Sequence, residues 1–461
     1  MNGSHGNDAN DGLSWKTAKR TIANAIETVS DGGTVNIANG VYKGAGNTNI
    51  IINKNITIKG QSKSSTIING TNRDQIFEIE NSFSKKVIIQ SLTITNGNSD
   101  GTAGAIYNGG TLTVKDVIFK DNTANYGGAI YNKGNLNIIR STFTTNTAKI
   151  NGGAVYNEGD LTVTSSAFTC NIISSGSNTI TLAHDIYNAG TLTAHFNQLE
   201  DYTYYYTSVN IPASATRTRT IYNDGGTVDA ELNWWGNNNG PAKNVTKTGF
   251  TVSKWLVLTA NTNSTTIPVN TNYKINADLR YDNNGILHTE GYVYGIPIIF
   301  STTFGTIGSK AYTVNGIAQF TLKSTSGGTG NVSIKLDAQQ FLKEVKIIDK
   351  VPPKVSSTNP KNNAAGFSRT ATISIKFNEN IKASTYWSKI YIKNMKTGKT
   401  AVISKSIKGN TLYIKMSSKR YAYTWYQVYI PKAAVKDSSN NKLAAVYTFK
   451  FKTGKYPLDY Q

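Results

Sequence analysis

The chain has 461 residues, a net charge of +21, and 41 glycines against 9 prolines and 1 cysteine. A single cysteine excludes an intramolecular disulfide, and because the sequence has no run of eighteen apolar residues we expect no transmembrane segment. The length exceeds one ordinary globular domain and is typical of about three.

A short amphipathic helix is predicted near the amino end, because apolar side chains recur there at helical spacing, at Trp15, Ala18, Ile22, Ala25 and Ile26. Such a helix would cover the open end of a repeat array, where a terminal coil otherwise exposes its core and strand edges. The preceding stretch, residues 8–12, is similar to a calcium loop but lacks the distal glutamate, so we favour a hydrogen-bonded turn.

One three-residue phrase, Ile/Val-Tyr-Asn, recurs five times between residues 106 and 223, and hydrophobic pairs follow it. In three copies a phenylalanine and, three residues later, an asparagine come next, as in Phe143 and Asn146. A period in the mid-twenties, built from short β-branched segments with Asn and Gly corners, predicts coils that bury their apolar faces by stacking. From residue 34 to 233 we expect about eight coils, closed by Trp234 and Trp235.

Stacked coils place equal side chains over one another, so each corner asparagine is expected to donate to the next coil's asparagine. Alternation within the phrase would turn isoleucine inward and tyrosine outward, which predicts an exposed aromatic stripe. Cys170, two residues after Phe168, is expected to point inward as a small apolar group. The last two repeats lengthen and predict loops at 171–183 and 199–220, the second of which is rich in tyrosine and arginine.

The repeat pattern ends near residue 254, and a different strand pattern follows. Residues 255–349 show alternating strands at eight-to-twelve-residue spacing, which predicts a β-sandwich. A Pro-Pro hinge at residues 352–353 precedes a second strand-rich unit. Residues 350–461 contain 19 Lys and 2 Arg against 3 acidic residues, a net charge of +18, so this unit carries most of the chain's surplus.

These motifs resemble known families. Residues 6–241 resemble the right-handed parallel β-helix of the pectin-lyase-like superfamily, and the repeats are similar to those of adhesin-like surface proteins of methanogenic archaea and of bacterial polymorphic outer-membrane proteins. Residues 255–348 resemble bacterial-type Ig-like repeats. Residues 351–453 resemble the Ig-like module of S-layer and adhesin proteins, with the pattern Pro431, Val435, Lys436, Asp437, Asn440 and Leu443.

The resemblance implies an all-β protein with three domains. They are a right-handed parallel β-helix with an N-terminal capping helix (1–254), an Ig-like β-sandwich (255–349) and a lysine-rich Ig-like β-sandwich (350–461). Because such motifs identify a fold better than an activity, catalysis needs a separate argument from the residues.

Catalytic residues are not predicted. Glycosidases and lyases on such scaffolds need clustered carboxylates, but the acidic residues of the repeat region are scattered; they include Glu78, Glu80, Asp116, Asp121, Glu158, Asp160, Asp185 and Asp229. The pair His184-Asp185 sits where earlier repeats have small residues, so a drifted repeat is the favoured interpretation. We expect no metal and no cofactor.

Two sets of residues are candidates for binding. A tyrosine stripe and the neighbouring loop could stack on sugar rings, although a ladder that merely stabilises strands is an equally simple interpretation; the set is Tyr107, Tyr131, Tyr156, Tyr187, Tyr222, Tyr204, Tyr205, Arg217 and Arg219. A polyanion could contact basic residues of the last domain; they are Lys389, Lys393, Lys396, Lys415, Lys419 and Arg420.

The function we expect is that of a secreted, non-enzymatic adhesin-like surface protein, monomeric, that binds a glycan, a cell-wall polymer or a partner cell. No nucleic-acid partner is expected, because lysine outnumbers arginine and no base-reading motif occurs. The start of the sequence lacks a secretion signal, which we expect to have been removed. A polysaccharide lyase or hydrolase, and a purely structural spacer, remain the alternatives.

Overall fold

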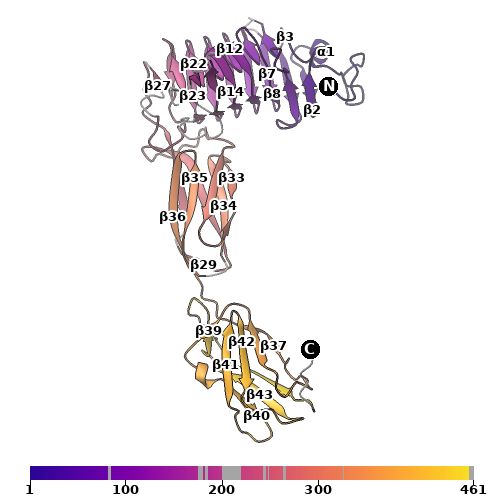
Figure 1. Ribbon diagram of the computed structural model, residues 1–461. Helices are drawn as coiled ribbons and strands as arrows, with labels where there is room; N and C mark the ends of the chain where they lie inside the picture. Colours follow the sequence, from indigo (N-terminus) through magenta and orange to yellow (C-terminus); the bar gives the residue numbers. More distant parts are fainter. Residues whose placement is uncertain are drawn as a thin grey trace.

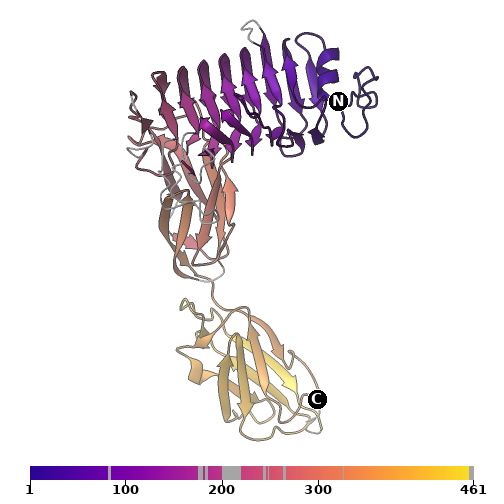
Figure 2. The same ribbon diagram turned by 45° about the horizontal axis from the view of Figure 1, so that its top comes forward.

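The computed structural model describes residues 1–80, 85–174, 180–181, 185–199, 220–241, 246–247, 249–262, 266–324 and 327–455. The fold is all-β, as predicted: parallel coils are followed by two antiparallel sandwiches. Figure 1 shows the coils stacked side by side, with one sandwich descending from their carboxyl-terminal end and the second beyond it. The turned view of Figure 2 shows the successive strands of the stack running in one direction.

Three parallel sheets form the walls of the β-helix. The first contains β1 (Thr34–Ile37), β4 (Ile56–Gly60), β7 (Lys86–Gln90), β10 (Thr111–Lys115), β14 (Asn135–Ile139), β18 (Asp160–Thr164), β23 (Thr191–His195) and β26 (Thr227–Asp229). The second contains β2 (Gly40–Lys43), β5 (Thr66–Asn69), β8 (Thr93–Thr95), β11 (Ile118–Lys120), β15 (Thr142–Thr144), β19 (Ala167–Thr169) and β24 (Gln198–Leu199). The third contains β3 (Ile50–Ile52), β6 (Phe77–Ile79), β9 (Ile106–Asn108), β13 (Ile130–Asn132), β17 (Val155–Asn157), β22 (Ile186–Asn188), β25 (Ile221–Asn223) and β27 (Thr246–Lys247). A short fourth sheet contains β12 (Thr123–Tyr126), β16 (Thr147–Asn151), β20 (Ile172–Ser174) and the antiparallel β21 (Ile180–Thr181).

The register follows the repeat. Each Ile-Tyr-Asn phrase pairs residue for residue with the phrase of the next coil, and Phe119, Phe143 and Phe168 stack with ring centroids 4.7 Å apart. Alternating burial turns Leu112 and Val114 of β10 into the core. Residue 134 must be glycine, because an added Cβ would lie 2.0 Å from the carbonyl oxygen of Gly110 in the preceding coil.

Buried asparagines form hydrogen-bonded ladders at the corners, as predicted. In the ladder formed by the last residues of the third-sheet strands, each Nδ2 donates to the Oδ1 of the next coil over 2.6 to 2.9 Å, through Asn108, Asn132, Asn157, Asn188 and Asn223. A second ladder runs through Asn122, Asn146 and Asn171 and ends on the buried carboxylate of Asp185. These amides satisfy one another in turns that the strands cannot pair.

Two expectations about the coils are wrong in detail. The capping helix α1 spans only Ile22–Thr28, and Trp15 lies outside it with half of its surface exposed. The reason is that the carboxylate of Asp8 accepts hydrogen bonds from the backbone N–H groups of Arg20 and Thr21, which holds the preceding segment as a loop. Cys170 is half-buried at a corner with φ of 55°, the position before the ladder asparagine, and does not join the core.

The first sandwich packs two antiparallel sheets. One contains β28 (Leu256–Thr262), β30 (Asn272–Asp282), β34 (Ile317–Lys323) and β32 (Thr306–Ile307). The other contains β29 (Thr266–Pro268), β36 (Gln339–Ile348), β35 (Gly328–Leu336), β31 (Pro297–Thr302) and β33 (Lys310–Tyr312). Phe300 and Phe320 meet between the two sheets.

This sandwich shares one hydrophobic core with the end of the β-helix. Phe196 and Trp234 from the last coils are buried in the same cluster as the sandwich residues. The indole Nε1 of Trp234 donates to Asp337 over 2.6 Å, and the Gln198 amide donates to both oxygens of that carboxylate over 3.1 and 3.2 Å. The two units are therefore joined by a packed interface.

His288 lies at the same junction, with its ring centroid 6.3 Å from that of Phe196. Its two ring nitrogens face the carboxylates of Glu290 and Asp282 at 2.6 and 3.2 Å. Burial lowers the pKa of His288, but the hydrogen bonds to the two carboxylates outweigh burial, so its pKa is raised from the ordinary value.

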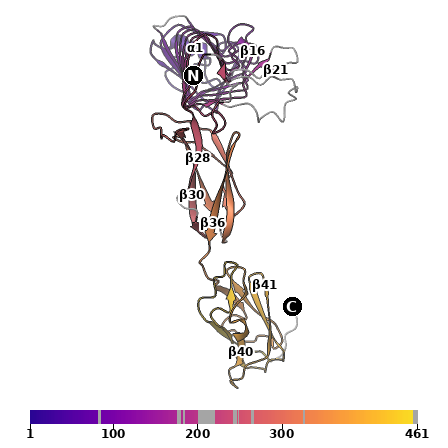
Figure 3. The same ribbon diagram turned by 90° about the vertical axis from the view of Figure 1, so that its left-hand side faces the viewer.

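The second sandwich has a core of its own. Its four-stranded sheet contains β37 (Val355–Asn359), β38 (Ile373–Phe377), β42 (Thr411–Met416) and β41 (Ile403–Lys408). The facing sheet, called here the β43 sheet, contains β40 (Tyr391–Asn394), β43 (Trp425–Ile430) and β45 (Tyr447–Lys452). A strand pair β39 (Lys382–Ala383) and β44 (Val435–Lys436) and the 3-10 turn η1 (Trp387–Lys389) complete it. Figure 3 shows this domain joined to the first sandwich through a thin connection.

Candidate functional site

The tyrosines of the repeat phrase form a continuous stack along the β-helix. Neighbouring ring centroids lie 4.5 to 5.7 Å apart and the rings are within 14° of parallel, for Tyr107, Tyr131, Tyr156, Tyr187 and Tyr222. The faces of the three central rings are therefore covered by the tyrosines of the adjacent coils. A sugar stacks on an exposed ring face, and these rings offer their edges instead.

Burial agrees with this geometry. Tyr131 and Tyr187 are only 6% exposed, so the prediction of an exposed stripe is wrong for these two residues, because the adjacent rings cover them. The hydroxyl of Tyr131 donates to Glu158 over 2.8 Å, and that of Tyr187 donates to Asp224. Burial, together with these carboxylates, raises the pKa of both phenols. The arrangement favours a ladder that stabilises the strands.

The neighbouring loop residues predicted to enlarge the stripe lie outside the described residues. They are Tyr204, Tyr205, Arg217 and Arg219. A role for them in binding stays a prediction.

Several carboxylates of the coils contact partners from adjacent coils. Arg140 forms two hydrogen bonds with Asp116, at 2.8 and 2.9 Å, and His195 lies 2.9 Å from Asp229. Asp185 is fully buried at the end of an asparagine ladder. These contacts give Asp116, Asp185 and Asp229 structural roles.

The basic residues predicted to bind a polyanion do not form one patch. Lys393 lies on the outer face of the β43 sheet, whereas Lys415 lies on the outer face of the opposite sheet, because both alternate with core residues. Lys389 ends η1, Lys396 follows β40 in a turn, and Lys419 follows β42 in a loop. The sandwich core separates the two groups.

The prediction that Arg420 contacts a polyanion is wrong. Its side chain is 1% exposed, and its guanidinium donates to the carbonyl oxygens of Ser368 and Ala371 over 2.9 to 3.0 Å. It also lies 5.3 and 5.6 Å from the ring centroids of Phe367 and Phe451. Burial lowers its pKa to about 10. Arg420 stabilises the domain interior and cannot contact a polymer.

An acidic cluster that no motif in the sequence predicted lies where the two sandwiches meet. Asp349, Glu379 and Asp437 are the only acidic residues between 349 and 455, and within the described chain their oxygens come within 4.8 Å of one another. Both oxygens of Asp437 accept hydrogen bonds from Asn441 over 2.8 Å. Burial and the two nearby carboxylates raise the pKa of Glu379. In the sequence, only the scarcity of acidic residues in this domain indicates that the few present have a special role.

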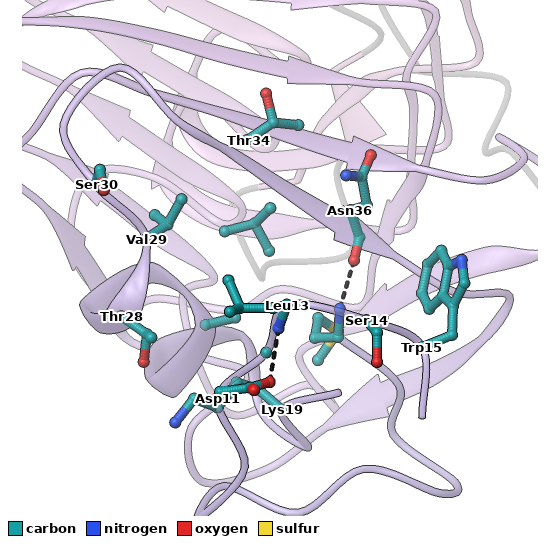
Figure 4. Close-up of a pocket in the computed structure, with 14 residues that line it drawn as sticks. Asp11, Leu13, Ser14, Trp15, Lys19, Thr28, Val29, Ser30, Thr34 and Asn36 are labelled. Atoms are coloured by element: carbon teal, nitrogen blue, oxygen red, sulfur yellow. Dashed lines mark hydrogen bonds between the residues drawn. The ribbon is translucent and has the colours of Figure 1, made fainter. Parts of the chain in front are cut away.

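A hollow of about 540 Å³ lies beside the capping helix (Figure 4). It is lined by the entry loop, including Leu13 and Trp15, and by Asn36 of β1, whose carbonyl oxygen accepts a hydrogen bond from the terminal amine of Met1. The carboxylate of Asp11 accepts a hydrogen bond from the backbone of Leu13, and Asp8 and Asn7 accept others in the same loop. The prediction of a hydrogen-bonded turn is confirmed here.

Family comparisons identify two parts of the chain. Residues 349–453 match the bacterial Ig-like domain, and residues 116–133 and 140–158 match the Chlamydia polymorphic membrane protein repeat. The predicted resemblance of the repeats to bacterial polymorphic outer-membrane proteins and the predicted Ig-like class of the last domain are confirmed, whereas the resemblance to archaeal adhesin-like proteins stays a prediction. No curated protein sequence matches the chain. Among the described residues, none of the helices has the length and apolar character needed to cross a bilayer.

Several solved structures are similar to part of the chain. The adhesin InvE of Yersinia pseudotuberculosis is 14% identical over 43% of this chain and 58% of its own, with a TM-score of 0.26. Invasin, a bacterial integrin-binding protein, is 14% identical over 43% and 40%, with a TM-score of 0.28. A C-terminal intimin fragment is 19% identical over 43% and 64%, with a TM-score of 0.17. The chain thus spans less than two thirds of each, and similarity at this level does not extend to function.

Proposed function

We propose that the protein is a non-enzymatic, adhesin-like surface protein that holds a glycan, a cell-wall polymer or the surface of a partner cell. The bacterial Ig-like match and the polymorphic membrane protein repeats support this class. The packed interiors of the coils also support it, since the asparagines and aromatic rings there are engaged with one another. Display outside the cell follows from the same class.

The C-terminal sandwich would retain the protein on an anionic polymer. The observation that carries this proposal is the segregation of charge: 21 basic side chains stand against three acidic ones between residues 349 and 455, and the three acidic ones gather at the junction with the first sandwich. The remaining surface of the domain therefore presents positive charge, which attracts polyanions. Lys393, Lys396, Lys415 and Lys419 are proposed to contribute to this field from both faces.

Binding of the full chain to immobilised polygalacturonate, with dextran as the uncharged control, tests the proposal. Because the screening length falls from about 8 Å at 0.15 M salt to about 3 Å at 1 M, we expect retention on polygalacturonate to fall steeply when 0.5 M salt is added. We expect no retention on dextran through this domain. Retention that is equal on both polymers, or that salt leaves unchanged, would contradict the electrostatic proposal.

A further inference from the structure

A groove of about 790 Å³ lies at one end of the β43 sheet, a volume within the range of small-ligand sites. Three tyrosines contribute to its wall: Tyr391 from β40, Tyr429 from β43, and Tyr386 from the turn before η1. Lys389 and Lys432, both exposed, come from the segments that flank these strands. We call this the rim groove.

The aromatic rings of the rim groove are arranged differently from those of the β-helix. Tyr391 and Tyr429 pair across adjacent strands and stack with centroids 4.7 Å apart and 11° between their planes. Because this stack has two rings rather than five, each ring keeps one face that the other does not cover. Tyr386 adds a ring that is 44% exposed, and Val446 beside it is 48% exposed. Exposed apolar surface with a polar rim is typical of an interaction site.

The charge around the groove has one sign. Lys389 and Lys432 line it, Lys393 lies two residues beyond Tyr391 on the same strand face, and Lys450 lies over the ring of Trp425, 5.5 Å from its centroid, on the same sheet. The three acidic residues between 349 and 455 gather in the junction cluster, and none of them lines the groove. The groove therefore complements an anion.

Rings and amines together select the class of anion. An exposed aromatic face stacks on the apolar face of a flat ring, and a lysine ammonium acts as a point charge that suits isolated carboxylates. Arginine forks, which grip phosphates with two parallel hydrogen bonds, are missing from the lining of the groove, since the basic residues there are lysines. These features match a chain of sugar rings that carry separate carboxylates better than they match a phosphate polymer.

We propose that the rim groove binds an acidic polysaccharide, with sugar rings over Tyr386 and Tyr391 and sugar carboxylates on Lys389 and Lys432. This inference rests on the proposed retention of the C-terminal sandwich on anionic polymers, and it names the contact surface and the chemistry of the polymer.

The test measures the affinity of the full chain for three soluble probes: oligogalacturonate, inorganic polyphosphate and single-stranded oligothymidylate. Tyr386→Ala is expected to weaken oligogalacturonate binding about tenfold and to leave polyphosphate binding within about twofold, because the sugar stacks on the ring and polyphosphate has no ring to stack. The exposure of Tyr386 makes this change compatible with folding, which an unchanged thermal transition of the domain would show. Tyr391→Phe keeps the ring and is expected to retain binding of oligogalacturonate.

A matched pair of lysines separates a local contact from general attraction. Lys376 and Lys408 both pair with Thr411 and are exposed on the outer face of the opposite sheet. The double change Lys389→Ala with Lys432→Ala is expected to weaken oligogalacturonate binding by more than tenfold, and Lys376→Ala with Lys408→Ala by no more than about twofold.

Each contrary result has a distinct meaning. Equal losses from the two lysine pairs would overturn the rim groove and leave the electrostatic retention standing. Binding to none of the three probes would overturn the proposed function itself. Tighter binding to oligothymidylate than to oligogalacturonate, lost in Tyr386→Ala, would replace the polysaccharide with a nucleic acid.

Discussion

Replacing Asn132 with aspartate changes one atom in the middle of the longest asparagine ladder. The Nδ2 of Asn132 donates to the Oδ1 of Asn157 over 2.7 Å and to the carbonyl oxygens of Gly134 and Asp160 over 3.0 and 3.3 Å. Aspartate replaces this donor with an oxygen, while its other oxygen can still accept the bond from Asn108. The Oδ1 of Asn157 therefore loses this donor in a buried corner. The carbonyl oxygens of Gly134 and Asp160 each lose one hydrogen bond, but that of Gly134 keeps the bond from the backbone N–H of Asp160.

The magnitude has two parts. A buried acceptor without a donor costs about 1 to 3 kcal/mol, so the lost bond to Asn157 accounts for roughly that amount. Burial and the facing oxygen of Asn157 also disfavour an ionised carboxylate, so they raise the pKa of the new aspartate. Each unit of that pKa shift lowers the free energy of unfolding by about 1.4 kcal/mol when the carboxylate is ionised. We expect Asn132→Asp to lower the free energy of unfolding of the β-helix by about 4 kcal/mol or more at pH 8.

The second part is reversible with acid. A protonated aspartic acid is neutral and donates one hydrogen bond, so the folded state takes up a proton that the unfolded state releases above a pKa of about 3.9. The penalty should then shrink by up to about 1.4 kcal/mol for each pH unit between the raised folded pKa and about 4. Hydrogen exchange of peptides from residues 106–138, measured in increasing urea at pH 8 and pH 5, gives the free energy of unfolding of these coils at each pH.

Asn137→Asp is the matched control, because Asn137 alternates with the core residues Leu136 and Ile138 and lies on the outer face of the next strand, between Thr113 and Thr162 of the adjacent coils. We expect it to change the stability by less than about 0.5 kcal/mol at either pH. A loss of stability for Asn132→Asp that equals the loss for the control, or that does not change between the two pH values, would refute the reasoning that the hydrogen bonds of the ladder amides stabilise the corners.

Three further predictions concern the tyrosine stack and the junction. Tyr131→Phe should cost about 1 kcal/mol by unfolding of the coils, since it removes one hydrogen bond and keeps the stack, and Tyr131→Ala should cost at least twice as much. Asp337→Asn should lower the stability of the β-helix and of the first sandwich together by about 1.5 kcal/mol, seen in hydrogen exchange on both sides of Trp234, with the last domain unaffected. Because the pKa of His288 is raised, this histidine stabilises the folded state fully below about pH 6.5, and the stabilisation is lost as pH rises through the pKa of the folded state. His288→Gln should remove this pH-dependent step from the urea midpoint of the first sandwich. A step that is unchanged in the variant would show that another group causes it.

The sequence was informative wherever one coil repeats another. The period placed Asn132 over Asn157 and Phe143 over Phe168, because equal positions in stacked coils must coincide. The same logic did not reveal how deeply Tyr131 is buried, since alternation gives the direction of a side chain but not what covers it. The ring-to-ring distance decided that outcome.

Other features depend on contacts between distant parts of the chain. The local sequence predicts that Arg420 is a surface charge. The fold buries it, because it places the carbonyl oxygens of Ser368 and Ala371, about fifty residues earlier in the chain, against the guanidinium. The carboxylates of Glu379 and Asp437 meet for the same reason. Trp234, expected only to close the coils, also binds Asp337 from 103 residues further along. No periodic signal reports such pairs.

The shared core between the last coils and the first sandwich bears on how such a protein could be rearranged during evolution. A recombination junction near residue 254 would strip Phe196 and Trp234 of the apolar surface that shields them, so the coils and that sandwich would have to be inherited as one piece. The C-terminal sandwich has a separate core, and a junction near residue 350 would leave both hydrophobic cores intact. The exchangeable module is the cationic end, so its preferred polymer could change while the long scaffold that displays it stays the same.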